Sequence, residues 1–141
     1  MISSLGRTVL LVRDHDEALA FYRDALGFTV LHDHTAGGQR YLHVGVPGQP
    51  GDPPVGLWLM KAGPADDALV GRQARGQPLL VLYTDACRAE VERLRERGVR
   101  VNQEPAEGDG AVFAHVADLY GNDPVLVQMP AVPAPSVASP E

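Results

Sequence analysis

The sequence contains little cysteine, almost no lysine and no long apolar stretch, and each shortage excludes a class of protein. A single cysteine, Cys87, excludes an internal disulfide framework and a cysteine-cluster metal site. No apolar run approaches the roughly 20 residues that cross a bilayer. The start, MISSLGRTVLLV, lacks the basic, apolar and small-residue regions of a signal peptide. We therefore expect a cytoplasmic protein with no membrane partner.

The charge balance argues against a second class, the nucleic-acid binders. Lys61 is the only lysine, and 12 basic residues stand against 18 acidic ones, for a formal net charge of −6. Phosphate contacts need a basic surface, so we expect no nucleic-acid partner. The 141 residues are 45% hydrophobic, which is enough for the core of one domain.

What is present is an order of strand, helix and turn signals that occurs twice. Asp14 precedes a helical pattern that Gly27 ends, and Asp85 and Gly98 take the same places 71 residues later. Alternating and apolar runs predict strands at 8–12, 28–34, 39–46 and 55–61 in the first half, and at 79–83, 99–103, 111–117 and 124–128 in the second. Each half reads βαβββ and is too small to hold a core alone.

This repeat divides the chain into five segments. We expect an N-terminal extension at 1–6, a first βαβββ module at 7–61, a linker at 62–78, a second βαβββ module at 79–129 and a mobile, proline-rich tail at 130–141. The two modules must pack together. The sequence leaves open whether they do so within one chain or by exchange between two chains.

Three motifs carry a resemblance to a known family. Residues 14–28 (DHDEALAFYRDALGF), the turn at 118–122 (DLYGN) and the run at 125–128 (VLVQ) resemble the vicinal oxygen chelate superfamily, which includes glyoxalase I, bleomycin-resistance proteins and extradiol dioxygenases. The resemblance covers residues 7–129. It implies an α+β fold in which two βαβββ modules form a cupped, mostly antiparallel mixed sheet around a central cavity, with the helices outside.

The resemblance also implies four inward positions at which metal-dependent members hold a divalent ion. In this sequence they fall on Arg7, Trp58, Leu79 (or Pro78, if the alignment moves by one residue) and Val125. None of these side chains offers a ligand for a divalent metal. We therefore expect no metal or other cofactor. A divalent metal would need a non-standard site, for which the spacing of His32 and His34 is suitable but no third ligand is identifiable.

Alternation along the strands predicts which side chains face the cup. Leu42 and Val44, together with Val46, form the apolar face that packs on a helix, so Tyr41 and His43 point the other way. Applied to every strand, this gives a cup lined by Arg7, Val9, Leu11, Tyr41, His43, Trp58, Met60, Val81, Tyr83, Phe113, His115, Val125 and Val127. From this lining we predict nine ligand-binding residues: Arg7, Tyr41, His43, Trp58, Met60, Tyr83, Phe113, His115 and Val125.

The leading hypothesis is a glyoxalase/bleomycin-resistance-like protein that lacks the metal ligands of the family. It would bind a small organic molecule, aromatic or anionic, in an aromatic cup, as a homodimer. The four aromatic side chains, Tyr41, Trp58, Tyr83 and Phe113, would stack on the ligand, and Arg7 would pair with an anionic group.

Three alternatives stay open. The first is a metal-dependent lyase, isomerase or dioxygenase whose site is displaced to His43, His115 or the pair His32 and His34. The second is an enzyme without metal in which His43 or His115 acts as a general base. The third is an interaction module whose cup is buried in an oligomer and binds no ligand. Whether the protein is an enzyme is left undecided by the sequence.

Overall fold

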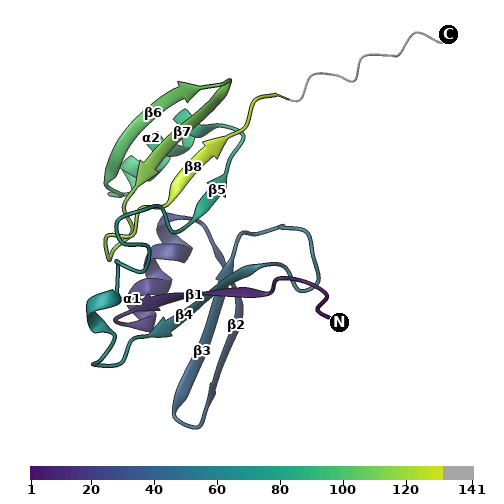
Figure 1. Cartoon of the computed structure of the whole chain (residues 1–141), viewed down its shortest axis with the longest axis vertical. Coiled ribbons are helices and arrows are strands. Elements are labelled where there is room, and N and C mark those ends of the chain that lie inside the picture. The colour runs from purple at the N-terminus through teal and green to yellow at the C-terminus, as the bar shows by residue number, and fades with distance from the viewer. Residues whose placement is uncertain (132–141) are drawn as a thin grey trace, which may run out of the picture.

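The computed structural model describes residues 1–131, which form two modules arranged along the long axis of the molecule (Figure 1). The first contains β1 (Arg7–Val12), α1 (His15–Leu19), the π-helix η1 (Ala20–Ala25), β2 (Thr29–Ala36), β3 (Gln39–Gly45) and β4 (Gly56–Lys61). The second contains β5 (Val81–Tyr83), α2 (Cys87–Glu96), β6 (Val101–Gly108), β7 (Ala111–Val116) and β8 (Val125–Gln128), and a short 3-10 helix, η2 (Asp67–Leu69), lies between them. The predicted α+β class and the repeated βαβββ order are confirmed.

The eight strands form two separate four-stranded sheets with the same topology. The strand orders are β1-β4-β3-β2 and β5-β8-β7-β6. In each sheet the first and last strands of the module run parallel and the other pairs run antiparallel, so both sheets are mixed and mostly antiparallel. β1 and β5 are both edge strands and do not pair with each other, so within residues 1–131 the two sheets stay separate.

A glutamine side chain covers the free edge of β1. The backbone N–H of Leu11 donates to Gln73 Oε1 over 2.7 Å, and Gln73 Nε2 donates to the carbonyl of Val9 over 3.0 Å. One amide thus takes the place of a neighbouring strand and satisfies edge groups that would otherwise attract one. The segment predicted as a linker, 62–78, therefore also closes the edge of the first sheet.

The helices cover one face of each sheet and leave the other face open. Leu42 and Val44 are fully buried against the helical side of the first module, and Ala114 and Val116 are buried in the same way in the second. This confirms the predicted alternation. Val46 is the exception: it lies beyond the end of β3 and is 43% exposed, because the strand stops at Gly45.

The helix boundaries follow the sequence signals at three of four ends. Asp14 caps the first helix through Glu17 N (2.8 Å), and Gly27 and Gly98 follow the two helices with φ of +81° and +83°. Asp85 does not cap α2. A side chain from β8 bonds the first residue of α2 instead: the backbone N–H of Cys87 donates to Gln128 Oε1 over 2.9 Å.

The two modules contact each other through residues of the motifs at 14–28 and 118–122. The hydroxyl of Tyr22, on η1, donates to Asp118 Oδ2 at 2.7 Å, and the Asn122 side-chain amide donates to the same oxygen at 2.7 Å. The other carboxylate oxygen accepts from the backbone N–H groups of Tyr120 and Asn122, both at 2.9 Å. Burial, reinforced by the Asp118 carboxylate, raises the pKa of Tyr22 well above its usual value. The motifs therefore have a structural role at the junction.

Two further expectations concern the ends of the chain and the membrane. Residues 132–141 of the predicted tail lie outside the described residues. Within residues 1–131, no helix combines the length and apolar character that a membrane span requires.

Candidate functional site

Five of the nine predicted residues gather on the open face of the first sheet, which we call face 1: Arg7, Tyr41, His43, Trp58 and Met60. His43 pairs directly with Trp58 across β3 and β4. The Trp58 ring centroid lies 5.6 Å from that of His43 and 5.7 Å from that of Tyr41. Met60 shares the face by strand alternation. Face 1 is therefore a continuous group of rings with a basic residue at one end.

Arg7 uses its guanidinium to hold face 1 together. Its Nη1 donates to the carbonyl of Gly6 at 2.8 Å and to that of Pro54 at 2.7 Å, and its Nε donates to His43 Nδ1 at 3.1 Å. These bonds tie the start of β1 to the segment before β4 and fix the plane of the His43 ring. The role predicted for Arg7, pairing with an anionic ligand, remains a prediction.

The His43 ring is held in its neutral form. Burial, and then the positive charge of Arg7 and the neighbouring His32, lower the pKa of His43 below its usual value. A guanidinium nitrogen only donates, so Nδ1 carries the lone pair that receives it, and the ring proton lies on Nε2.

The other four predicted residues, Tyr83, Phe113, His115 and Val125, lie on the second sheet, and we call this group face 2. His115 Nδ1 is 2.9 Å from Asp123 Oδ2, and Asn102 donates to the other oxygen of Asp123 at 3.0 Å. A carboxylate accepts, so Nδ1 carries a proton, and in the neutral ring Nε2 keeps its lone pair. The Phe113 and His115 ring centroids are 6.5 Å apart. Face 2 thus offers an acceptor at the position where face 1 offers a donor.

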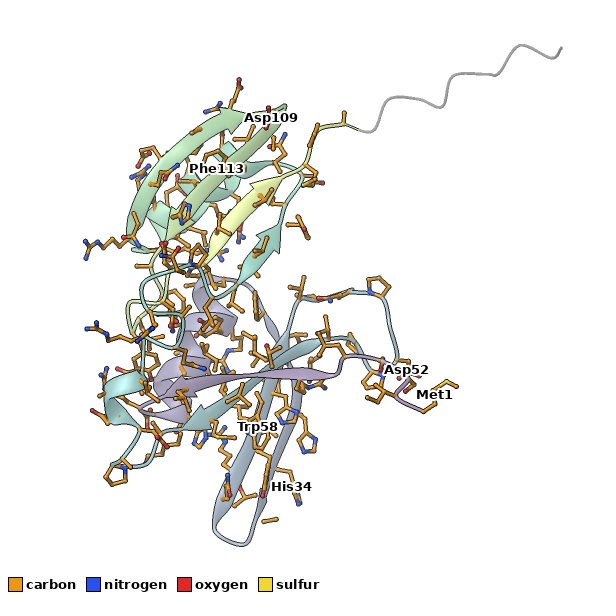
Figure 2. All side chains as sticks on the ribbon, in the orientation of Figure 1. Met1, His34, Asp52, Trp58, Asp109 and Phe113 are labelled. Atoms are coloured by element: carbon orange, nitrogen blue, oxygen red, sulfur yellow. The ribbon has the colours of Figure 1, made fainter. Side chains whose placement is uncertain are left out.

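One chain does not bring the two faces together. Among residues 1–131, the ring contacts of these side chains run within face 1 or within face 2, and none joins them. Trp58 and Phe113 lie in different modules (Figure 2). Tyr83 is 74% exposed and Val81, beside it, 55%. The predicted cup is therefore present as two separate halves.

A cleft of about 1010 Å³ lies between the modules and is lined by none of the residues of face 1. Of the nine predicted residues only Tyr83 lines it. Its other walls are the turn at 26–28, the loop at 45–49, the start of β4 at 55–57 and the strand β5 with its flanks. Sequence reasoning missed this cleft. The only signal for it is the glycine- and proline-rich run at 45–56, which predicts a loop and does not predict what the loop faces.

The residues expected at the metal positions of the family do not form a metal site. Arg7 is engaged as described, Trp58 is an indole on face 1 and Val125 begins β8. Leu79 lies before β5 and packs against the core of the first module. None of these four side chains has an atom that can act as a ligand to a divalent metal ion.

The histidines of the non-standard site lie beside His43. The His32 ring centroid is 6.1 Å from that of His34 and 5.1 Å from that of His43. Within the described part of the chain, no group of three or more histidine, cysteine, aspartate or glutamate side chains is arranged to hold a metal ion. His43 Nδ1 already accepts from Arg7.

Comparison with known proteins gives a family match over most of the chain. Residues 4–124 match the model of the Glyoxalase/Bleomycin resistance protein/Dioxygenase superfamily. An uncharacterized protein from Shewanella frigidimarina is 34% identical over 132 residues, which is 92% of this chain and 96% of that protein.

Solved structures agree with this match. The crystal structure of UcmS2 has a TM-score of 0.78 and 33% identity and covers 92% of this chain and 100% of its own. TnmS3, described as an antibiotic binding protein from Streptomyces sp. CB03234, has a TM-score of 0.73 and 30% identity over 89% of this chain and 94% of its own. Glyoxalase I from Zea mays shares the fold with a TM-score of 0.70 at 17% identity, and the match covers 46% of that chain.

Proposed function

This chain belongs to the Glyoxalase/Bleomycin resistance protein/Dioxygenase superfamily, and on that premise we propose that it binds a small aromatic molecule on face 1. One observation carries the proposal: Tyr41, His43 and Trp58 form a contiguous, partly exposed group of rings on the open side of a four-stranded sheet. Such a surface binds flat molecules with little loss of side-chain freedom. The similarity to an antibiotic binding protein supports the same class of ligand.

The proposed binding requires no metal. The positions at which metal-dependent relatives would hold an ion carry Arg7, Trp58, Leu79 and Val125, whose side chains are not ligands for divalent metals. Binding energy would come from stacking and from burial of apolar area.

We propose further that the working unit is a homodimer in which face 2 of one copy covers face 1 of the other. The exposed side chains Val9 (38%), Val81 (55%) and Tyr83 (74%) on the two faces support this arrangement, because each would bury apolar area on association. Light scattering during gel filtration tests it: a mass of about twice 15.1 kDa is expected, and a monomer at micromolar concentration contradicts the dimer.

The binding proposal is tested with a panel of aromatic antibiotics and protein treated with EDTA. Trp58 is the only tryptophan, so its fluorescence reports directly on face 1. We expect saturable quenching by at least one compound, unchanged by EDTA. Calorimetry on Tyr41→Leu should show a tenfold or greater loss of affinity, with Leu69→Ala, an exposed position on η2, as the unaffected control. Binding that needs an added metal contradicts the proposal.

A second candidate function rests on the His115–Asp123 pair. A carboxylate 2.9 Å from Nδ1 orients an imidazole so that Nε2 can accept a proton from a bound molecule, which is the arrangement of a general base. Mass spectrometry of the bound compound after incubation separates the two functions. Recovery of unchanged compound supports binding alone, whereas conversion that His115→Phe abolishes supports acid–base catalysis.

A further inference from the structure

Two nitrogen atoms on face 1 carry hydrogens for which residues 1–131 offer no acceptor. They are Nε2 of His43 and Nε1 of Trp58, and both are shielded from solvent. The two rings are direct neighbours, with centroids 5.6 Å apart. Buried N–H groups in folded proteins are almost always paired, so two adjacent exceptions require an explanation.

Both atoms are hydrogen-bond donors. Arg7 Nε donates to His43 Nδ1, which leaves the ring proton of the neutral imidazole on Nε2. The indole Nε1 has a hydrogen and no lone pair to offer. An acceptor is therefore the only group that satisfies either of them, and an oxygen, with two lone pairs, can accept two such hydrogen bonds.

We propose that His43 and Trp58 form a donor pair for an acceptor oxygen, a carbonyl or a carboxylate, attached to the flat ring of the bound molecule. This inference rests on the proposed function and adds the polar group that the ligand must carry. The Tyr41 ring, 5.7 Å from that of Trp58, provides the surface on which the ligand ring packs. Arg7 is the positioning residue, because its bond to Nδ1 holds the His43 proton on Nε2.

The geometry adds two requirements. Both nitrogens are shielded although their rings are partly exposed, so the side chains that cover them must move aside when the oxygen arrives. A cationic ligand is disfavoured, because its N–H groups would meet two further N–H groups beside the guanidinium of Arg7.

The test compares probes that differ in the acceptor oxygen. We would titrate the full chain, labelled with ¹⁵N and treated with EDTA, with 2-naphthamide, 2-naphthoate and 2-ethylnaphthalene. The single tryptophan gives a single indole N–H signal. We expect a downfield shift of that signal with the two oxygen-bearing probes and no such shift with 2-ethylnaphthalene.

Two variants remove one ring N–H each. Trp58→Phe keeps an aromatic ring, and His43→Asn keeps an acceptor oxygen for Arg7. Calorimetry should show each variant binding 2-naphthamide about fivefold more weakly, the net effect of one neutral hydrogen bond, and 2-ethylnaphthalene within about twofold of the unmodified chain. The amide spectrum of each variant establishes that it is folded.

The outcomes separate the two proposals. An equal loss for both probes, an unchanged affinity for 2-naphthamide, or an indole signal that does not move overturns the donor pair and leaves binding on face 1 standing. No binding by any of the three probes contradicts the donor pair and the proposed function together. If one variant does not fold, the other variant and the indole signal still decide the question.

Discussion

His43 and His115 occupy equivalent positions of the repeat, but their Nδ1 atoms have hydrogen-bond partners of opposite kind, a donor for His43 and an acceptor for His115. Arg7 donates to Nδ1 of the first, so its outer nitrogen is a donor, and Asp123 accepts from Nδ1 of the second, so in the neutral ring its outer nitrogen is an acceptor. The sequence places both on an open face but contains no local sign of this difference. The partners come from the start of β1 and from the loop before β8, and neither lies within three residues of its histidine.

The lowered pKa of His43 predicts how stability depends on pH. Because the folded pKa lies below the unfolded value near 6.5, the unfolded chain binds more protons as the pH falls, and the contribution to stability is present above pH 6.5 and lost below it. We expect the urea concentration at the midpoint of unfolding to decrease as the pH is lowered from 7.5 to 5.5. His43→Asn should reduce this slope, and a residual slope should come from His15, whose pKa is lowered chiefly by burial and by Arg40. An unchanged slope in His43→Asn contradicts the assignment.

The hydroxyl of Tyr22 is expected to matter more than that of Tyr120. Tyr22→Phe removes a buried 2.7 Å bond to the Asp118 carboxylate and should lower the free energy of unfolding by about 1.5–3 kcal/mol. Tyr120→Phe is the matched control, since its hydroxyl bonds to Asp14 and Glu17 are more exposed and longer, at 3.1–3.3 Å, and should cost less than about 1 kcal/mol. Equal losses in urea titrations would show that the junction does not depend on Tyr22.

At the scale of the elements, most of the fold could be predicted, because its signals are local. Asp14, Gly27 and Gly98 mark helix ends through their own backbone and side-chain preferences, and strand alternation follows from apolar spacing. The π-helical turn at 20–25 and the Gln73 cap on β1 could not be predicted. Both involve contacts between residues far apart in the sequence: Tyr22, within the turn, bonds Asp118, and Gln73 bonds the edge of β1.

The segment at 62–78 gives a prediction with an internal control. Gly71 and Gly38 share a φ of +78°, but a Cβ at Gly71 would lie 1.9 Å from the Tyr120 carbonyl oxygen, whereas at Gly38 nothing lies within 4 Å. Gly38→Ala should cost only the left-handed backbone penalty of about 1–2 kcal/mol. Gly71→Ala adds a clash and should cost about 3 kcal/mol or more. Similar melting temperatures for the two variants would contradict close packing of this segment on the second module.

At the scale of the whole molecule, there are two candidate ligand sites, face 1 and the cleft between the modules. Face 1 has the contiguous rings and the unpaired donors, whereas the cleft between the modules has a volume of about 1010 Å³. The sequence predicted the first from strand alternation. It could not predict the second, because a cleft between modules is set by how they pack, and no residue pattern encodes that directly.

The central claim, that the chain binds an aromatic molecule on face 1 without a metal, is tested most directly by one spectrum. The ¹⁵N amide and indole signals of EDTA-treated protein are recorded during titration with the tightest-binding antibiotic of the panel. We predict that the signals that move are the Trp58 indole and the amides around Tyr41, His43 and Trp58 on β3 and β4. Movement confined to the loop at 45–49 and to β5, which line the cleft, would contradict the claim.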